Sequence, residues 1–188
     1  MTEAPIIYAR TPSPIGELVL AANGQGLTGL YVPGHQAIDT VISLGTPDES
    51  PFGTVIGELD EYWSAKRTDF SVPIAPVGTP FQLAVWKQLR RIPYGGTVSY
   101  LDLAKRIGRP SAARAVGSAN ARNPISILIP CHRVVGSAGS LTGYAGGLDR
   151  KRWLLAHEST MKNGKPGKRV ESEVAAQERG HERLTSSS

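Results

Sequence analysis

Apolar and polar positions alternate in two stretches of the first half of the chain, which predicts β-strands there. The stretch 16–32, GELVLAANGQGLTGLYV, alternates on both sides of Asn23-Gly24, a dipeptide that favours a tight turn between antiparallel strands. The stretch 69–77, DFSVPIAPV, is also typical of extended chain. Between them, four apolar residues recur at helical spacing: Val55, Leu59, Tyr62 and Trp63. We therefore expect a small sheet with a helix packed on it.

The pattern changes after residue 78, where apolar residues take up helical spacing. Thr79 is a favourable N-cap, and Pro80 suits the first position of a helix. Five apolar side chains then mark one helical face that ends at PYGG: Phe81, Ala84, Val85, Leu89 and Ile92. We expect a mostly helical domain to begin here.

The stretch 97–124, TVSYLDLAKRIGRPSAARAVGSANARNP, predicts two short helices. Ser99 caps the first helix, with Asp102 three residues on, and Gly108 ends it. Ser111 is the expected cap of the second helix. This spacing is that of a helix-turn-helix unit. Spacing alone does not establish DNA binding, because many helical hairpins bind nothing.

These elements predict an α/β fold in two domains. We expect a supporting sheet-plus-helix domain over residues 1–78, because that half shows no cluster of ionisable groups that suggests chemistry. A helical domain follows over residues 79–161. The tail, residues 162–188, holds six basic and four acidic residues, has few large apolar ones and ends in TSSS, so we expect disorder there.

The chain carries a net charge of +5, but this charge is unevenly distributed. Residues 1–89 hold four basic and nine acidic side chains, whereas residues 90–122 hold seven basic and one acidic, a net charge of +6. Six of those seven are arginines, which pair well with phosphate, so we expect a polyanionic partner. No apolar run approaches the length of a membrane span, and the amino terminus lacks a signal-peptide pattern. We therefore expect a cytoplasmic protein with no membrane partner.

The second of the two short helices, SAARAVGSAN at 111–120, consists almost entirely of small residues. Arg114 is the long side chain in its middle. A closely packed internal helix would also use small residues, but the arginine would then need a buried partner. A helix that lies along a nucleic-acid groove, with Arg114 reaching into the base stack, explains both features.

The chain has a single cysteine, Cys131, within ILIPCHRVVG. One thiol forms no internal disulfide and builds no zinc site that needs several thiolates. Unpaired cysteine is usually inert packing, but two prolines, Pro124 and Pro130, fix the approach of the chain to this one. A thiol becomes a nucleophile as thiolate, which requires a nearby base or positive field.

His132 is one candidate base, and Glu158 in WLLAHE is a candidate to orient its imidazole. His157 and Glu158 are equally compatible with exposed residues at a helix end. Spacing leaves both interpretations open.

The combination of motifs is more specific than its parts. IPCHRVVG, followed by GYAGG and KRWLLAHE and preceded by AARAVG and NP, closely resembles the O6-alkylguanine-DNA alkyltransferases, or methylated-DNA–protein-cysteine methyltransferases. The strong motifs cover residues 79 to 158, and the first half matches loosely through SPIGELVLAA and YW. The resemblance implies a ribonuclease-H-like first domain and a monomer that needs no cofactor. It also implies that the substrate is double-stranded DNA carrying O6-alkylguanine, with O4-alkylthymine and cooperative DNA binding left open.

In that family, an alkylated guanine is flipped out of the duplex and a cysteine takes its alkyl group irreversibly. Carried to this chain, Cys131 is the acceptor, His132 is its base through a water molecule, and Glu158 orients the histidine. Asn123 braces the active-site turn. Tyr100 helps to give a proton to the leaving guanine and crowds the phosphate during flipping.

The resemblance also assigns the pocket and the DNA-binding helix. The backbone carbonyls of Cys131 and Val134 contact the base, and Tyr144 and Ala145 close the pocket. Arg114 fills the gap in the stack, and its neighbours on the same helix are the expected DNA-binding residues: Ala113, Ala115, Gly117 and Ser118.

Two departures from the family pattern stand out. Some members have a serine where this chain has Ala145, so any contact with the base there must come from the backbone. The zinc ligands of some relatives' first domains are absent, and we expect no metal.

Three rival functions remain. A cysteine hydrolase would use Cys131, His132 and Glu158 but would release product repeatedly. A non-catalytic DNA-binding protein would use the two short helices alone, and the presence of Cys131 argues against it. A purely structural protein leaves the basic segment and the small-residue helix unexplained.

Overall fold

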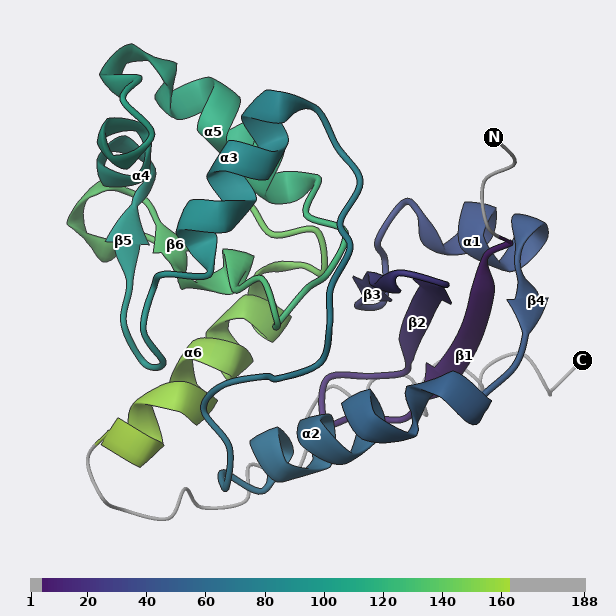
Figure 1. Cartoon of the computed structure of the whole chain (residues 1–188). Coiled ribbons are helices and arrows are strands. Elements are labelled where there is room, and N and C mark those ends of the chain that lie inside the picture. The colour runs from purple at the N-terminus through teal and green to yellow at the C-terminus, as the bar shows by residue number, and fades with distance from the viewer. Residues whose placement is uncertain (1–4, 163–188) are drawn as a thin grey trace, which may run out of the picture.

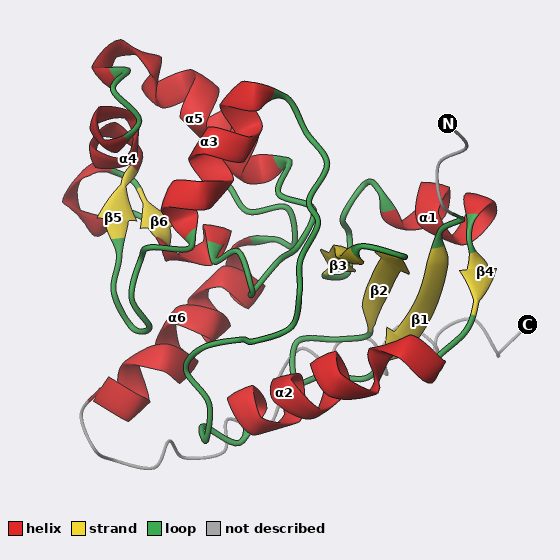
Figure 2. Ribbon diagram, viewed as in Figure 1, coloured by secondary structure: helices red, strands yellow, loops and turns green. Residues whose placement is uncertain are grey.

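The computed structural model describes residues 5–162. Figure 1 shows a lobe built around a β-sheet and a second, mostly helical lobe, with a long segment that crosses from one to the other. The ribbon in Figure 2 shows that the longer strands all lie in the first lobe, together with helices, and that the second lobe is mostly helical. None of the helices within residues 5–162 has the length and apolar character needed to cross a membrane.

The sheet contains four strands in the order β3-β2-β1-β4. Their bounds are Ile7–Thr11 for β1, Leu18–Asn23 for β2, Gly26–Tyr31 for β3 and Thr46–Pro47 for β4. The three long strands are antiparallel, and β4 runs parallel to β1. Asn23 pairs with Gly26, which confirms the predicted hairpin.

Two helices belong to this lobe. Helix α2, Gly53–Trp63, lies alongside the sheet in Figure 1 and buries Val55, Leu59 and Tyr62, as the helical spacing predicts. Helix α1, Ile38–Leu44, was not predicted, because Val41 is its one buried residue and its apolar pattern is weak.

The free edge of β3 is covered by segments from outside the sheet. The backbone N–H of Leu30 donates to the carbonyl of Pro124 (2.8 Å), and the N–H of Ser126 donates to the carbonyl of Leu30 (2.8 Å). At the other end of the strand, Leu27 bonds with the backbone of Pro73 and Ala75. The predicted extended segment 69–77 therefore meets the sheet through a single isolated bridge rather than as a full strand.

Helix α3, Pro80–Leu89, opens the second lobe with a capping box between Thr79 and Gln82, which confirms the predicted start. The predicted apolar face is only partly correct. Ala84 is exposed, and Trp86 is buried instead. The indole N–H of Trp86 donates to the carbonyl of Ala119 (2.9 Å), a long-range contact that periodicity does not reveal.

Helices α4, Tyr100–Arg106, and α5, Ala113–Ala121, pack against each other and against α3. Ser99 accepts from the backbone of Asp102, as predicted, and Gly108 ends the helix with a φ of +72°. The predicted cap at Ser111 is wrong: this residue lies in a 3-10 turn, and α5 begins after Ala112 with no side-chain cap. Pro110 opens this 3-10 turn, so Ser111 lies inside the turn and not at the residue that precedes the α-helix.

Two short parallel strands, β5 (Val98–Ser99) and β6 (Val134–Val135), join α4 to the segment after Cys131. Helix α6, Leu148–Lys162, ends the described part of the chain, so the expected disorder of the tail falls almost wholly outside it. One hydrophobic core runs through both lobes and includes Leu20 and Leu30 from the sheet together with Leu103 and Leu154 from the helices.

Candidate active site and nucleic-acid interface

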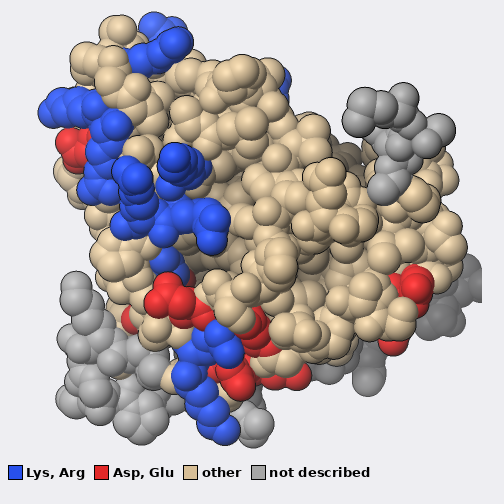
Figure 3. All heavy atoms as spheres, in the orientation of Figure 1, with Lys and Arg blue, Asp and Glu red and all other residues tan. Residues whose placement is uncertain are grey.

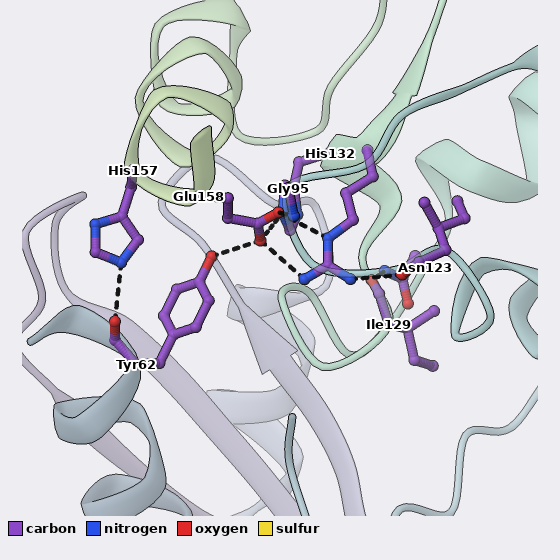
Figure 4. A network of polar contacts seen from close by, with 9 residues as sticks. Tyr62, Gly95, Asn123, Ile129, His132, His157 and Glu158 are labelled. Atoms are coloured by element: carbon purple, nitrogen blue, oxygen red, sulfur yellow. Dashed lines mark hydrogen bonds and ion pairs between the residues drawn. The ribbon is translucent and has the colours of Figure 1, made fainter. Parts of the chain in front are cut away.

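The cysteine sits at the end of a tight turn that follows α5. The side chain of Asn123 bridges this turn: its carbonyl oxygen accepts from the N–H of Ile125 (3.1 Å), and its amide donates to the carbonyl of Ile129 (2.7 Å). Figure 4 shows Asn123 directed toward Ile129. Ile127 is held at a φ of +73°, which costs energy for a β-branched residue and marks the turn as strained.

Cys131 is 4% exposed and begins the 3-10 turn Cys131–Arg133. Burial raises the pKa of Cys131, while Asn123 and the charge of Lys151 act in the opposite direction. Lys151, from α6, is fully buried, and its ammonium donates to the carbonyls of Val134 (2.6 Å) and Thr142 (2.7 Å). The sequence did not predict this lysine, although KRWLLAHE contains it.

His132 and Glu158 are both fully buried and in contact, with 2.8 Å between Nε2 of His132 and Oε1 of Glu158. The interpretation of Glu158 as an exposed helix-end residue is therefore wrong. Burial lowers the pKa of His132, and Glu158 acts in the opposite direction. Within residues 5–162, Nδ1 of His132 has no hydrogen-bond partner, and no direct bond joins the imidazole to the thiol.

Three further groups surround Glu158, and the sequence predicted none of them. Arg133 donates from Nε to Oε2 (2.8 Å) and from Nη2 to Oε1 (2.9 Å). The hydroxyl of Tyr62 donates to Oε1 (2.8 Å), and the N–H of Gly95 donates to Oε2 (3.1 Å). Figure 4 shows Tyr62, Gly95 and His132 converging on this carboxylate. Burial alone would raise the pKa of Glu158, but His132 and Arg133 outweigh it and hold this pKa well below the usual range.

Of these three groups, Arg133 alone could have been suspected from the sequence, because it directly follows His132 in the motif. Tyr62 lies 96 residues before Glu158, and no local pattern connects them. His157, the neighbour of Glu158, does not join the site: its Nε2 contacts the backbone carbonyl of Tyr62 (2.8 Å), and its ring stacks on Trp153.

Tyr100 and Tyr144, two of the predicted site residues, are half-buried. The hydroxyl of Tyr100 donates to the carbonyl of Thr142 (3.2 Å), and burial is the main cause that raises its pKa. Burial also raises the pKa of Tyr144 well above its usual value. A charge on Cys131 also acts to raise the pKa of each tyrosine.

The two carbonyls predicted to contact the base already have protein donors. Lys151 donates to Val134, and the amide of Asn120 donates to the carbonyl of Cys131 (3.3 Å). The Cys131 carbonyl also accepts from the backbone N–H of Val134, so both of its lone pairs are engaged. Ala145 is exposed in the loop that follows Tyr144.

The surface of α5 has the opposite character. Arg114 is exposed and, among the described residues, makes no hydrogen bond or ion pair, which excludes the interpretation of α5 as an internal helix with a buried arginine. Along the same helix Ala115 and Ser118 are exposed, and Ala113 is half-buried. Gly117 lies beside Tyr100, since a Cβ there would be 3.7 Å from the tyrosine ring.

Charge is divided between the lobes. In Figure 3 most Lys and Arg side chains gather over the region where Figure 1 places α3 and α4, while most Asp and Glu lie along α2. This division matches the excess of basic residues in 90–122. Within residues 5–162 no three His, Cys, Asp or Glu side chains form a group that could hold a metal ion.

Comparison with known proteins identifies two family models and several relatives that match this chain. The sequence model of the 6-O-methylguanine DNA methyltransferase DNA-binding domain matches residues 80–160, and that of the ribonuclease-like domain matches residues 6–76. The methylated-DNA–protein-cysteine methyltransferase of Mycobacterium tuberculosis H37Rv is 47% identical over 155 residues, which are 82% of this chain and 93% of that protein. The protein of the same name from Methanosarcina acetivorans is 46% identical over 154 residues, covering 81% and 98%.

A solved structure agrees with these matches. The crystal structure of Mycobacterium tuberculosis OGT in complex with DNA superposes with a TM-score of 0.78 and 46% identity, over 82% of this chain and 94% of that one. Because both domain models match, and because relatives close to half identical cover most of its length, the chain belongs to the 6-O-methylguanine DNA methyltransferase family.

Proposed function

We propose that this protein repairs duplex DNA by transferring an alkyl group from O6 of guanine to Cys131, once per molecule. The observation that carries the proposal is the buried contact between Glu158 and His132, the residue that directly follows the single cysteine. Tyr100 and the small-residue helix α5 lie beside each other in the same lobe. The DNA complex of the relative from Mycobacterium tuberculosis supports a nucleic-acid substrate.

The transfer needs one proton to move and one bond to be exchanged. His132 takes the thiol proton through a water molecule, and Glu158 holds the imidazole and balances its charge. The sulfur gives an electron pair to the alkyl carbon, and the bond between that carbon and O6 breaks, leaving its pair on guanine. Tyr100 gives a proton to the guanine and recovers one from His132, so the thiol proton ends on the base.

Tyr100 suits this part because burial raises its pKa and keeps the proton on its hydroxyl until the leaving base develops charge. The carbonyls of Cys131 and Val134 hold the extruded guanine, and at Cys131 one of the two protein donors, Asn120 or the N–H of Val134, gives way to the base. Tyr144 and the backbone at Ala145 close the pocket over it, and no cofactor is needed.

On the DNA side, α4 and α5 act as a helix-turn-helix unit with α5 on the duplex. The small residues of α5, including Ala113, Ala115, Gly117 and Ser118, let its backbone approach the groove closely. Arg114 enters the base stack in place of the guanine. Its contacts there offset the cost of base extrusion, which is on the order of a few kcal/mol.

The remaining assignments follow from the same proposal. Residues 1–78 form a ribonuclease-H-like supporting domain, and residues 79–161 carry the chemistry and the DNA contact. The protein acts as a monomer on cytoplasmic DNA, and O4-alkylthymine is a second substrate to test.

The test is intact-mass measurement after incubation with a duplex that contains O6-methylguanine. The mass should rise by one methyl group on the peptide that contains Cys131, activity should then cease, and Cys131→Ser should gain nothing. Repeated turnover without an adduct would establish a hydrolase instead. Tight DNA binding with neither adduct nor turnover would establish a non-catalytic binding protein.

A further inference from the structure

Tyr62 reaches the candidate catalytic carboxylate from the sheet lobe. This residue is fully buried near the end of α2, and its hydroxyl donates to Oε1 of Glu158 at 2.8 Å. The same oxygen lies 2.8 Å from Nε2 of His132. Tyr62 and His132 therefore share one acceptor atom, although they come from different lobes.

The donors around Glu158 differ in kind. Arg133 contacts both oxygens and adds a positive charge, and Gly95 holds Oε2 through the backbone. Arg133 is also fixed by a bond to the carbonyl of Ile92 (2.7 Å), so it would stay in place without Tyr62. The tyrosine hydroxyl is neutral and draws electron density from Oε1 without adding charge.

We propose that Tyr62 is a positioning residue of the alkyl-transfer site: its hydroxyl occupies a lone pair of Glu158 Oε1 and so weakens the hold of this oxygen on the proton of His132. This inference rests on the function proposed above. The proposal predicts the direction in which the pH dependence of methyl transfer moves when the hydroxyl is removed. Without the hydroxyl, Oε1 binds the His132 proton more strongly, so the imidazolium persists to higher pH and His132 becomes available as the base for Cys131 only at higher pH.

The other titratable groups near Tyr62 do not supply this effect. His157 of α6 contacts the Tyr62 backbone rather than the hydroxyl, and its ring centroid lies 5.1 Å from the phenol. Tyr94, on the segment before β5, packs edge-on against Tyr62, and burial together with the charge of Glu158 raises its pKa to about 12. Burial and Glu158 also raise the pKa of Tyr62 well above its usual value. Both phenols thus stay neutral across the working range.

The test is the pH profile of single-turnover methyl transfer by Tyr62→Phe, which keeps the ring and its packing. The acid limb, where the rate falls as His132 is protonated, should move to higher pH by about half a unit. This is a fraction of the roughly one to two units that a lost hydrogen bond to a charged group is worth, because the effect reaches the imidazole through the carboxylate. The rate on the plateau should stay within about two-fold of the unsubstituted protein, because Arg133 and Gly95 still hold the carboxylate. Tyr31→Phe, a buried tyrosine of the sheet lobe outside this network, is the matched control and should not move the limb.

A second measurement covers a variant that fails to fold. Placing 3-fluorotyrosine at position 62 makes the hydroxyl a stronger donor, so the limb should move to lower pH. An unmoved limb in the variant that folds, or shifts opposite to those stated, would overturn the proposal. Failure of the proposed function is separate, because the unsubstituted protein would then form no adduct at any pH.

Discussion

The interior site and the surface of α5 are built in opposite ways. Cys131, His132 and Glu158 are each at most 4% exposed, and donors from both lobes fix the carboxylate. Arg114 projects from a helix of small residues and has no partner within residues 5–162. Chemistry requires groups held in place before the substrate arrives, whereas a contact with a deformable duplex can form on binding. Substitutions in the two regions should therefore have separable effects.

The largest separation is expected from Glu158→Gln. The amide keeps the shape of the side chain but cannot balance an imidazolium, so the thiol pKa should rise and methyl transfer should slow by about 100-fold. Affinity for unmodified duplex should be nearly unchanged, because Glu158 is fully buried. Transfer rates and DNA titrations on the same folded preparation check this. A matching loss of DNA affinity would remove Glu158 from the catalytic role.

Arg114→Ala should slow transfer only on a substrate that must be extruded from duplex DNA. At saturating protein, repair of duplex should slow by about 10-fold, because the extruded base loses the side chain that replaces it in the stack. Repair of a soluble benzylated guanine, which needs no extrusion, should be unchanged. Single-turnover kinetics on both substrates make the comparison. An unchanged saturated rate on duplex would reject insertion, and equal losses on both would make Arg114 structural.

Acidification should lower the stability of the folded protein through its buried histidines. Burial lowers the pKa of His132 and of His35 in the folded state, so the unfolded chain binds more protons below a pH of about 6.5. The stability that these neutral histidines contribute is present above that pH and is lost as pH falls below it. Each can contribute at most about 1.4 kcal/mol per pH unit. Urea unfolding at several values between about pH 7.5 and 5.5 should show the decline, with a shallower slope in His132→Gln; equal slopes would assign the effect to other groups.

The smallest effect is expected from a substitution of Arg109, one of the basic residues in 90–122. Arg109 is exposed, with its guanidinium 5.7 Å from the ring centre of Phe81. Arg109→Gln should weaken duplex binding a few-fold and reduce the slope of log affinity against log salt by about one, while the saturated transfer rate stays the same. Arg10→Gln on the sheet lobe, where Arg10 pairs with Glu17, is the matched control. An unchanged slope for Arg109→Gln would place that residue off the DNA.

Local features could be predicted from the sequence because neighbouring residues determine them. The capping box at Thr79, the cap at Ser99, the turn after Asn23 and the end of α4 at Gly108 all follow from side chains a few residues apart. The contact between His132 and Glu158 was reached differently, through motifs whose family pairs them.

Contacts between distant segments could not be predicted. The bonds of Tyr62 to Glu158, of Trp86 to Ala119 and of Leu30 to Pro124 join residues with no common period or motif. The wrong cap at Ser111 has a local cause, since a 3-10 turn absorbs Pro110 before the α-helix begins. Lys151 was missed because a fully buried lysine runs against the usual preference of its type.

The cover over β3 also bears on aggregation. An open strand edge offers unpaired N–H and carbonyl groups to any extended chain, and GLTGLY carries no charge to discourage such pairing. In the whole protein, the turn beside the cysteine and the segment before α3 occupy this edge. A fragment that stops at residue 78 would lose the bonds of Leu30 to Pro124 and Ser126 and would expose that end of the strand. The sheet lobe made alone should therefore self-associate, because the turn that holds the thiol also covers one end of the strand edge.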